Sequence, residues 1–134
     1  MMTVRELSRK ANVTPDAIRH YVRIGLLTPE RNRRNQYRLF PAGQVKIVKF
    51  IRQAKSLGFT LNEIREILAH AKQGRSPCPT VRALIETHID RNRRVLAEVQ
   101  ALQTRMEGAL AKWKTMPDGV PDGDAICKLI ESVM

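Results

Sequence analysis

The longest stretch of this sequence without a helix-breaking residue runs over residues 80–114, which contain no proline and one glycine, Gly108. Alternating steps of four and three residues from Val81 reach ten positions, eight of them apolar, a spacing that is typical of a coiled-coil seam. These positions are Val81, Ile85, His88, Asn92, Val95, Val99, Leu102, Met106, Ala109 and Trp113. A helix of roughly 35 residues is about 50 Å long. Since so small a chain offers this helix no partner, we expect it to pair with a second copy; packing back on its own domain is the alternative.

Positive charge is confined to the part of the chain that precedes this helix. The 134 residues carry a net charge of +11. Residues 1–75 contain 16 Lys and Arg against 5 Asp and Glu, whereas residues 76–134 contain 8 of each. A basic and apparently folded half favours a polyanion as partner, most often nucleic acid. A merely solubilising surface would not be restricted to one half.

Two short helices are predicted at the N-terminus. Apolar residues at helical spacing indicate a helix over residues 3–11, and Asn12 and Val13 break it. A second helix begins after Thr14, with Pro15 at its first position and Asp16 in its first turn, and Gly25 closes it. This arrangement is a helix-turn-helix, whose second helix would enter a major groove of DNA.

Residues 31–40 follow as a basic hairpin, with four arginines, turn-forming asparagines and Tyr37. Further helices are expected from Pro41 to Gly58 and, after a capping box at Thr60, through Leu68. The predicted organisation is mainly α: a winged helix-turn-helix DNA-binding domain over 1–75, a dimerisation helix over 76–115, and, over 116–134, a loop followed by a short amphipathic helix at 125–131.

Several classes of protein are not favoured by the sequence. No apolar run approaches the roughly 20 residues of a membrane helix, and the N-terminus does not open a signal peptide, so no membrane partner is expected. Two cysteines make no disulfide framework, which places the protein in the reducing cytoplasm. No phosphate loop, zinc-protease motif or nucleophile elbow supports an enzyme. A general RNA-binding or architectural DNA-binding protein would not call for the neutral C-terminal half.

Four motifs in order carry a family resemblance: VTPDAIRHY at 13–21, IGLL at 24–27, YRLF at 37–40 and LGFTLNEI at 57–64. They resemble the mercury-resistance-type (MerR) transcriptional regulators, and the likeness extends over essentially the whole chain. The resemblance implies a winged helix-turn-helix, an antiparallel homodimer helix and a C-terminal effector loop. It also implies an activator that binds a palindromic operator in a promoter with an overlong spacer. On effector binding, such a regulator distorts the double-stranded DNA and so realigns the promoter for RNA polymerase.

The candidate DNA contacts lie on the second helix and the hairpin. Arg19 on the recognition helix can reach a guanine edge or a phosphate. Tyr37 and Arg38 match the family's backbone-contacting positions, and the other hairpin arginines would add salt-dependent phosphate contacts. The complete set is Thr14, Arg19, Tyr21, Arg31, Arg33, Arg34, Tyr37 and Arg38.

The effector is the less determined part of the prediction. The family's metal sensors place one cysteine at the start of the dimer helix and two in the loop of the other subunit. Cys78 and Cys127 match the first and last, and Trp113 stands where the middle one is expected, which argues against a three-thiolate site. Two thiolates from two chains suit a thiophilic ion such as Hg(II) or Cu(I).

Other ions and other signals remain open alternatives for the same two cysteines. Zn(II), Cd(II) or Pb(II) would need added ligands, for which Asp118, Asp122 and Asp124 are nearest. His88 is too far along the helix from Cys78 to share a site within one chain, and it lies in the seam. A redox or electrophile sensor acting through one thiol, or a small organic effector with structural cysteines, would use the same DNA-binding regulator.

Overall fold

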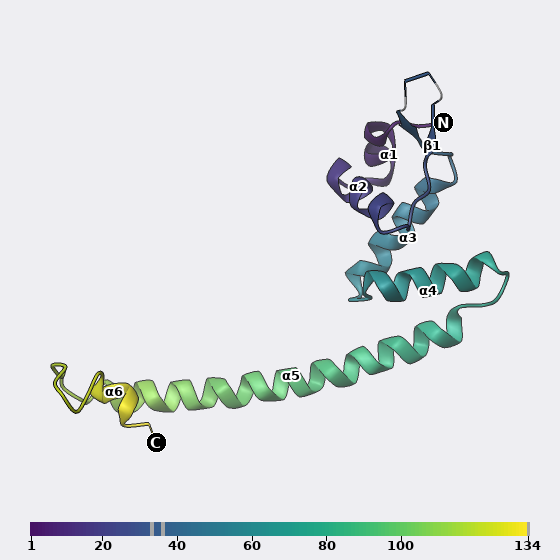
Figure 1. Cartoon of the computed structure of the whole chain (residues 1–134). Helices are drawn as coiled ribbons and strands as arrows, with labels where there is room; N and C mark the ends of the chain where they lie inside the picture. The colour runs from purple at the N-terminus through teal and green to yellow at the C-terminus, as the bar shows by residue number, and fades with distance from the viewer. Residues whose placement is uncertain (33, 36, 134) are drawn as a thin grey trace. The chain divides into compact units, whose positions relative to one another are not determined.

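The structure is a computed structural model that describes residues 1–32, 34–35 and 37–133. The elements are α1 (Val4–Ala11), α2 (Pro15–Arg23), β1 (Glu30–Arg31), β2 (Arg38–Leu39), α3 (Gln44–Ser56), α4 (Leu61–Lys72), α5 (Cys78–Trp113) and α6 (Lys128–Glu131) (Figure 1). The predicted mainly helical fold with a winged helix-turn-helix is confirmed. The chain divides into two compact units, Met1–Glu86 (unit 1) and Thr87–Met134 (unit 2), and each is described by itself.

Side-chain caps fix the helix starts of unit 1 where the sequence predicts them. The Thr14 hydroxyl accepts a hydrogen bond from the amide of Ala17 at 3.1 Å and so begins α2. Thr60 and Glu63 form the predicted capping box of α4, with hydrogen bonds of 3.1 and 2.8 Å. A cap of this kind stabilises a helix by about 1 kcal/mol. Between α1 and α2, Asn12 takes a left-handed conformation with φ of 56°, which makes the tight reversal of the helix-turn-helix.

The basic segment forms the expected hairpin, although its strands are short. β1 pairs antiparallel with β2, with Glu30 opposite Leu39 and Arg31 opposite Arg38. Backbone hydrogen bonds of 2.8 and 2.7 Å between Met2 and Phe40 tie the N-terminus to the residue that follows β2. The hairpin is therefore anchored at its base to the body of unit 1.

Three predicted helix boundaries differ from the structure by three residues or more. α3 begins at Gln44 rather than Pro41, because residues 41–43 form a turn in which the Gln44 amide donates to the Pro41 carbonyl at 3.0 Å. α4 continues past Leu68 to Lys72, since no helix-breaking residue occurs before Gly74, whose φ is 75°. The helix expected over residues 125–131 is shorter and begins at Lys128.

The hydrophobic core lies in unit 1, where α1 contacts α2 and α3, and α3 contacts α4. Its largest fully buried side chains are Phe40, Leu7, Ile18, Leu27, Ile51, Ile64 and Val48. Val81, Leu84 and Ile85 from the first turns of α5 also pack against this core. The compact unit consequently extends to Glu86, beyond the predicted domain boundary at residue 75.

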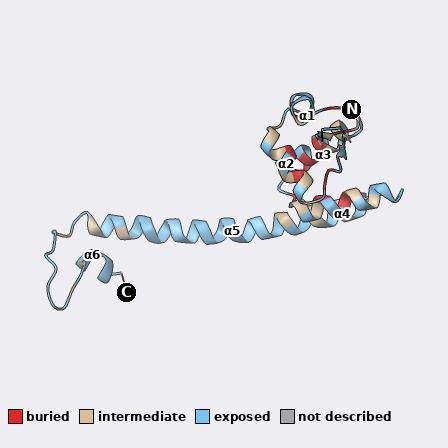
Figure 2. Ribbon diagram, turned by 45° about the horizontal axis from the view of Figure 1, so that its top comes forward, coloured by how far each residue is buried: buried red, intermediate tan, exposed pale blue. Residues whose placement is uncertain are grey.

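Beyond those first turns, α5 is exposed along its length (Figure 2), and none of its 36 residues is buried. The seam positions in the middle of the helix stand open to solvent, with exposed fractions of 49% at Val95, 56% at Val99, 42% at Leu102 and 56% at Met106. The seam alternates with polar and charged residues, and none of the described helices offers an apolar span long enough to cross a membrane. A regular apolar stripe of this kind on a long helix is a surface for a second helix.

Candidate nucleic-acid interface and thiol site

Arg19 projects from α2, the second helix of the helix-turn-helix. Its guanidinium Nη1 lies 2.9 Å from Oδ1 of Asp16, one turn earlier on the same helix, and both side chains are exposed. An exposed ion pair of this spacing contributes at most about 1 kcal/mol, so a phosphate or a guanine edge can replace the carboxylate. Arg19 is thus held on the exposed face of α2 and available to an anionic partner. Thr14 is also exposed, but its hydroxyl already caps α2.

Tyr21, another predicted contact on α2, is largely buried. Only 8% of its surface is exposed, because its ring forms part of the core of unit 1. Burial raises the pKa of its hydroxyl above the ordinary value of 10.0. Tyr21 therefore helps to pack α2 on the core of unit 1, and its contact with DNA stays a prediction.

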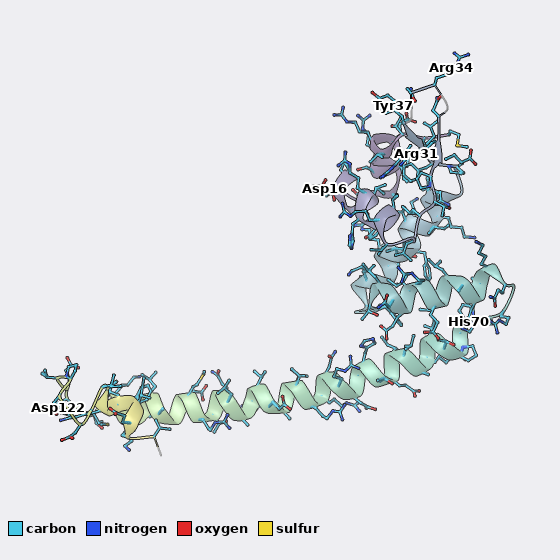
Figure 3. The ribbon with its side chains drawn as sticks, viewed as in Figure 1. Asp16, Arg31, Arg34, Tyr37, His70 and Asp122 are labelled. Atoms are coloured by element: carbon cyan, nitrogen blue, oxygen red, sulfur yellow. The ribbon has the colours of Figure 1, made fainter. Side chains whose placement is uncertain are left out.

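The described cations of the hairpin differ in exposure, since Arg31 and Arg34 are exposed and Arg38 is half-buried. Figure 3 shows Arg34 at the hairpin tip, pointing away from the helices of unit 1. Tyr37 is 70% exposed. Arg31 and Arg38 lie opposite each other across the two strands, a like-charge pair that favours an anion between or beside them. Among the described residues no ion pair engages Arg31, Arg34 or Arg38. The predicted contact Arg33 lies outside the described residues.

Two asparagines shape the described part of the hairpin loop through hydrogen bonds to backbone amides. Asn32 Oδ1 accepts from the Arg34 amide at 2.8 Å, and Asn35 Oδ1 accepts from the Tyr37 amide at 3.0 Å. A backbone hydrogen bond of 2.9 Å from Asn32 to the Tyr37 carbonyl closes the loop. Local side-chain bonds of this type satisfy backbone amides in turns. The backbone here is consequently held by residues other than those that carry the charge.

A second group of cations in unit 1 was not identified from the sequence. A cavity of about 530 Å³ between α1 and α3 is lined by Lys10, Lys49 and Arg52, with Asn12 and Gln53 among the other lining residues. Lys49 and Arg52 are three residues apart on α3, which carries no acidic residue in its first turn. The regular spacing of basic residues on α3 could have been recognised in the sequence. The position of Lys10 beside them could not, because it depends on the packing of α1 against α3.

The two cysteines lie in different units, and both are free thiols. Cys78 is the first residue of α5 and is exposed, with its amide donating to Ser76 Oγ at 3.3 Å. Cys127 is half-buried and directly precedes α6. In the parts of the chain described here, no group of three or more His, Cys, Asp or Glu side chains is placed to hold a metal ion. The described part of a single chain therefore presents no cluster of three such ligands.

The other candidate ligands are placed as follows. Asp118, Asp122 and Asp124 are exposed in the loop after α5, and His88 and Trp113 are half-buried on α5. Asp122 Oδ1 accepts from the amides of Asp124 and Ala125 at 2.7 and 2.8 Å, which makes it a turn-forming residue. The two free thiols are the soft donors among these candidates, and soft thiolates suit thiophilic ions.

Known proteins similar to this chain were found by sequence and by structure. The family model described as MerR HTH family regulatory protein matches residues 2–71, and the one described as MerR, DNA binding matches residues 45–109. The HTH-type transcriptional regulator HmrR of Sinorhizobium medicae is 33% identical over 132 residues, which cover 98% of this chain and 86% of that protein. Heavy metal-dependent transcription regulator 2 of Rhizobium meliloti is 31% identical over 101 residues, 75% of this chain and 69% of that protein. The solved structure of the transcription regulator PbrR691 from Ralstonia metallidurans in complex with lead(II) has a TM-score of 0.78 and 25% identity, and the match covers both chains completely.

Proposed function

The chain belongs to the MerR family of transcriptional regulators, and from that premise we propose that it activates transcription in response to a thiophilic metal ion. As a member of this family it is a DNA-binding regulator that acts as a homodimer on promoter DNA, and not an enzyme. The observation that carries the more specific proposal is the pair of free thiols, one at the first residue of α5 and one beyond its other end. The expected setting is the cytoplasm, where such thiols stay reduced.

The DNA-binding part of the proposal rests on the charges of unit 1. Arg19 on α2 would contact the major groove, while Arg31, Arg34, Tyr37 and Arg38 of the hairpin would contact the phosphate backbone. Thr14 would contribute as the cap that presents the first turn of α2. Arg33 belongs to the same hairpin sequence and is proposed on that basis alone. Two copies related by a two-fold axis require a palindromic operator with a fixed half-site spacing.

The dimer part rests on the exposed seam of α5. Val95, Val99, Leu102 and Met106 leave an apolar stripe in solvent, and a second α5 running antiparallel covers it with the same residues. A helix of 36 residues is about 54 Å long. Cys78 begins this helix, and Cys127 follows its other end. An ion bound by both residues would therefore take one thiolate from each chain of an antiparallel pair.

The metal part is supported by the donor chemistry and by the relatives. One relative is named as heavy metal-dependent, and the solved structure of another holds lead(II). Two thiolates without a third protein ligand suit Hg(II) or Cu(I), whereas Zn(II), Cd(II) or Pb(II) would need oxygen or nitrogen ligands in addition. Binding would draw the two chains together at each end of the dimer and change the twist of the operator. A protein can change DNA twist through backbone contacts alone, at a cost in deformation energy. The altered twist would realign the two promoter elements so that RNA polymerase can engage both.

A second candidate signal is favoured by the exposure of Cys78. An exposed thiol reacts directly with oxidants and electrophiles, and such a sensor needs no ion. In this alternative the same DNA-binding regulator responds to redox stress, while a small organic effector would leave both cysteines with structural roles.

Replacement of each cysteine by serine tests these alternatives. We expect Cys78→Ser and Cys127→Ser each to abolish promoter induction by metal ions in a panel that includes Hg(II), Cu(I), Zn(II), Cd(II) and Pb(II), with operator affinity unchanged. Loss of response in only one variant, accompanied by induction with an alkylating agent in the wild type, would favour the single-thiol sensor. Unaltered metal induction in both variants would refute the thiolate site.

A further inference from the structure

Glu131 ends α6, and its side chain folds back to the beginning of that helix. Its Oε2 accepts hydrogen bonds from the amide of Cys127 at 2.9 Å and from the amide of Ile126 at 3.0 Å. Both amides stand at the N-terminal end of α6, where backbone N–H groups have no partner within the helix. One carboxylate oxygen thus fixes the backbone of Cys127 and of the residue before it.

The energetic weight of this contact follows from the length of α6. A helix of four residues is too short to be stable in water through its own hydrogen bonds. Hydrogen bonds to a carboxylate are roughly twice as strong as neutral ones. The Glu131 contact is therefore a principal constraint on the extended conformation of Cys127, whose φ and ψ are −142° and 109°. These backbone angles set the direction in which the thiol leaves the chain.

The segment around Cys127 is also tied down on both sides. Before it, the Asp122 carboxylate closes the turn that ends at Ala125. After it, Lys112 Nζ in the last turn of α5 donates to the carbonyl of Ser132 at 3.2 Å. Cys127 is consequently held at a defined position near the end of the predicted dimer helix. Among the described residues, the hydrogen bond to Glu131 is the one of these contacts that engages the Cys127 amide itself.

We propose that Glu131 is a positioning residue for Cys127, which it presents to the effector ion without being a ligand itself. The inference rests on the proposed function of Cys127 as a thiolate ligand. It adds a residue that neither the cysteine pattern nor the acidic loop residues indicated. Groups that orient a metal ligand typically change metal affinity by about 10- to 100-fold when they are removed.

The test compares Glu131→Ala and Glu131→Gln in the full-length dimer, with Hg(II) as the probe. Hg(II) affinity is measured by competition with a small dithiol, followed through the thiolate-to-metal charge-transfer absorbance. We expect Glu131→Ala to weaken binding by about 10- to 100-fold. We expect Glu131→Gln to recover most of the loss, because the amide oxygen still accepts from both backbone N–H groups. Glu107→Ala is the matched control, since this carboxylate lies on α5 and accepts from Gln103.

A second readout needs no metal. In the apo protein, alkylation of Cys127 is compared with that of Cys78 in each variant by peptide mass analysis. We expect Glu131→Ala to change the rate at Cys127 several-fold and to leave Cys78 as an internal reference. Equal rates in all variants would overturn the inference. An equally large loss of Hg(II) affinity in the Gln and Ala variants would overturn it too, because the charge and not the hydrogen-bond geometry would then matter.

The Cys127→Ser variant distinguishes a failure of the positioning role from a failure of the proposed thiolate site. If Cys127→Ser abolishes Hg(II) binding while Glu131→Ala binds as the wild type does, the positioning role is wrong and the thiolate site stands. If Cys127→Ser itself leaves Hg(II) affinity and stoichiometry unchanged, the proposed function fails.

Discussion

Arg38 offers a quantitative test of the hairpin as a phosphate-binding element. It lies in β2 opposite Arg31, and among the described residues neither guanidinium has a carboxylate partner. A phosphate near this pair would relieve the like-charge repulsion, so its contact with Arg38 is expected to be strong. Because the regulator binds as a homodimer, each substitution removes two contacts from the complex.

The magnitude follows from counterion release. Each phosphate contact contributes about 0.9 to the slope of log K against log salt, so Arg38→Ala should reduce the slope by about 1.8. That difference corresponds to about a 12-fold change in relative affinity between 50 and 200 mM salt. Loss of affinity should be similar for operator and non-operator DNA, since phosphates carry no sequence information.

The assay is fluorescence anisotropy of a labelled operator over a series of salt concentrations. Arg38→Lys keeps the charge and should retain most of the slope. Arg94→Ala, which removes an exposed cation from α5, should leave it unchanged. A slope in Arg38→Ala equal to that of the wild type would refute the placement of the hairpin on the DNA backbone. A loss restricted to the operator sequence would instead assign Arg38 to base recognition.

Three further predictions address the dimer, the coupling and the core. Val99→Asp should convert the dimer to a monomer in sedimentation experiments, because it places a charge in the apolar seam, while Gln100→Asp next to it should remain dimeric. Leu84→Ala should keep operator and metal affinities within a few-fold yet reduce promoter induction, since this side chain packs the first turns of α5 on the core of unit 1. Full induction would contradict a coupling between metal binding and the DNA-binding unit through these turns. Burial raises the pKa of the Tyr21 hydroxyl, so above pH 10 the folded protein keeps a proton that the unfolded chain loses. The free energy of unfolding should therefore fall as the pH rises above 10. Tyr21→Phe should show a smaller alkaline loss in urea unfolding, and an identical pH profile would refute the argument.

The parts of the fold that could be predicted are those that short-range chemistry determines. Thr14 and Thr60 begin helices because a hydroxyl can satisfy an amide three residues on, which is a local rule. Tyr21 shares the buried face of α2 with Ile18, as their helical spacing predicts, because spacing along a helix is also a local rule. The role of Glu131 could not be predicted, because a carboxylate at the end of a four-residue helix belongs to no sequence motif. The cavity beside Lys10 could not be predicted, since it exists only after α1 has packed on α3.

The seam of α5 shows why a periodic pattern can serve two purposes at once. Val81 and Ile85 continue the same heptad spacing as Val95 and Val99, yet they pack on the core of unit 1 while the later positions remain exposed. The alternative of packing on the chain's own domain therefore applies to the first turns, and pairing with a second copy stays the prediction for the rest of the helix. The division has a mechanical consequence, because the first turns of α5 belong to the same packed body as α2 and the hairpin. Cys78 is the first residue of that helix, so the proposed ion, if shared with a second chain, would apply force directly to the body that carries the recognition helix. A bond between subunits at this position can thus change DNA twist without any change inside the DNA-binding core.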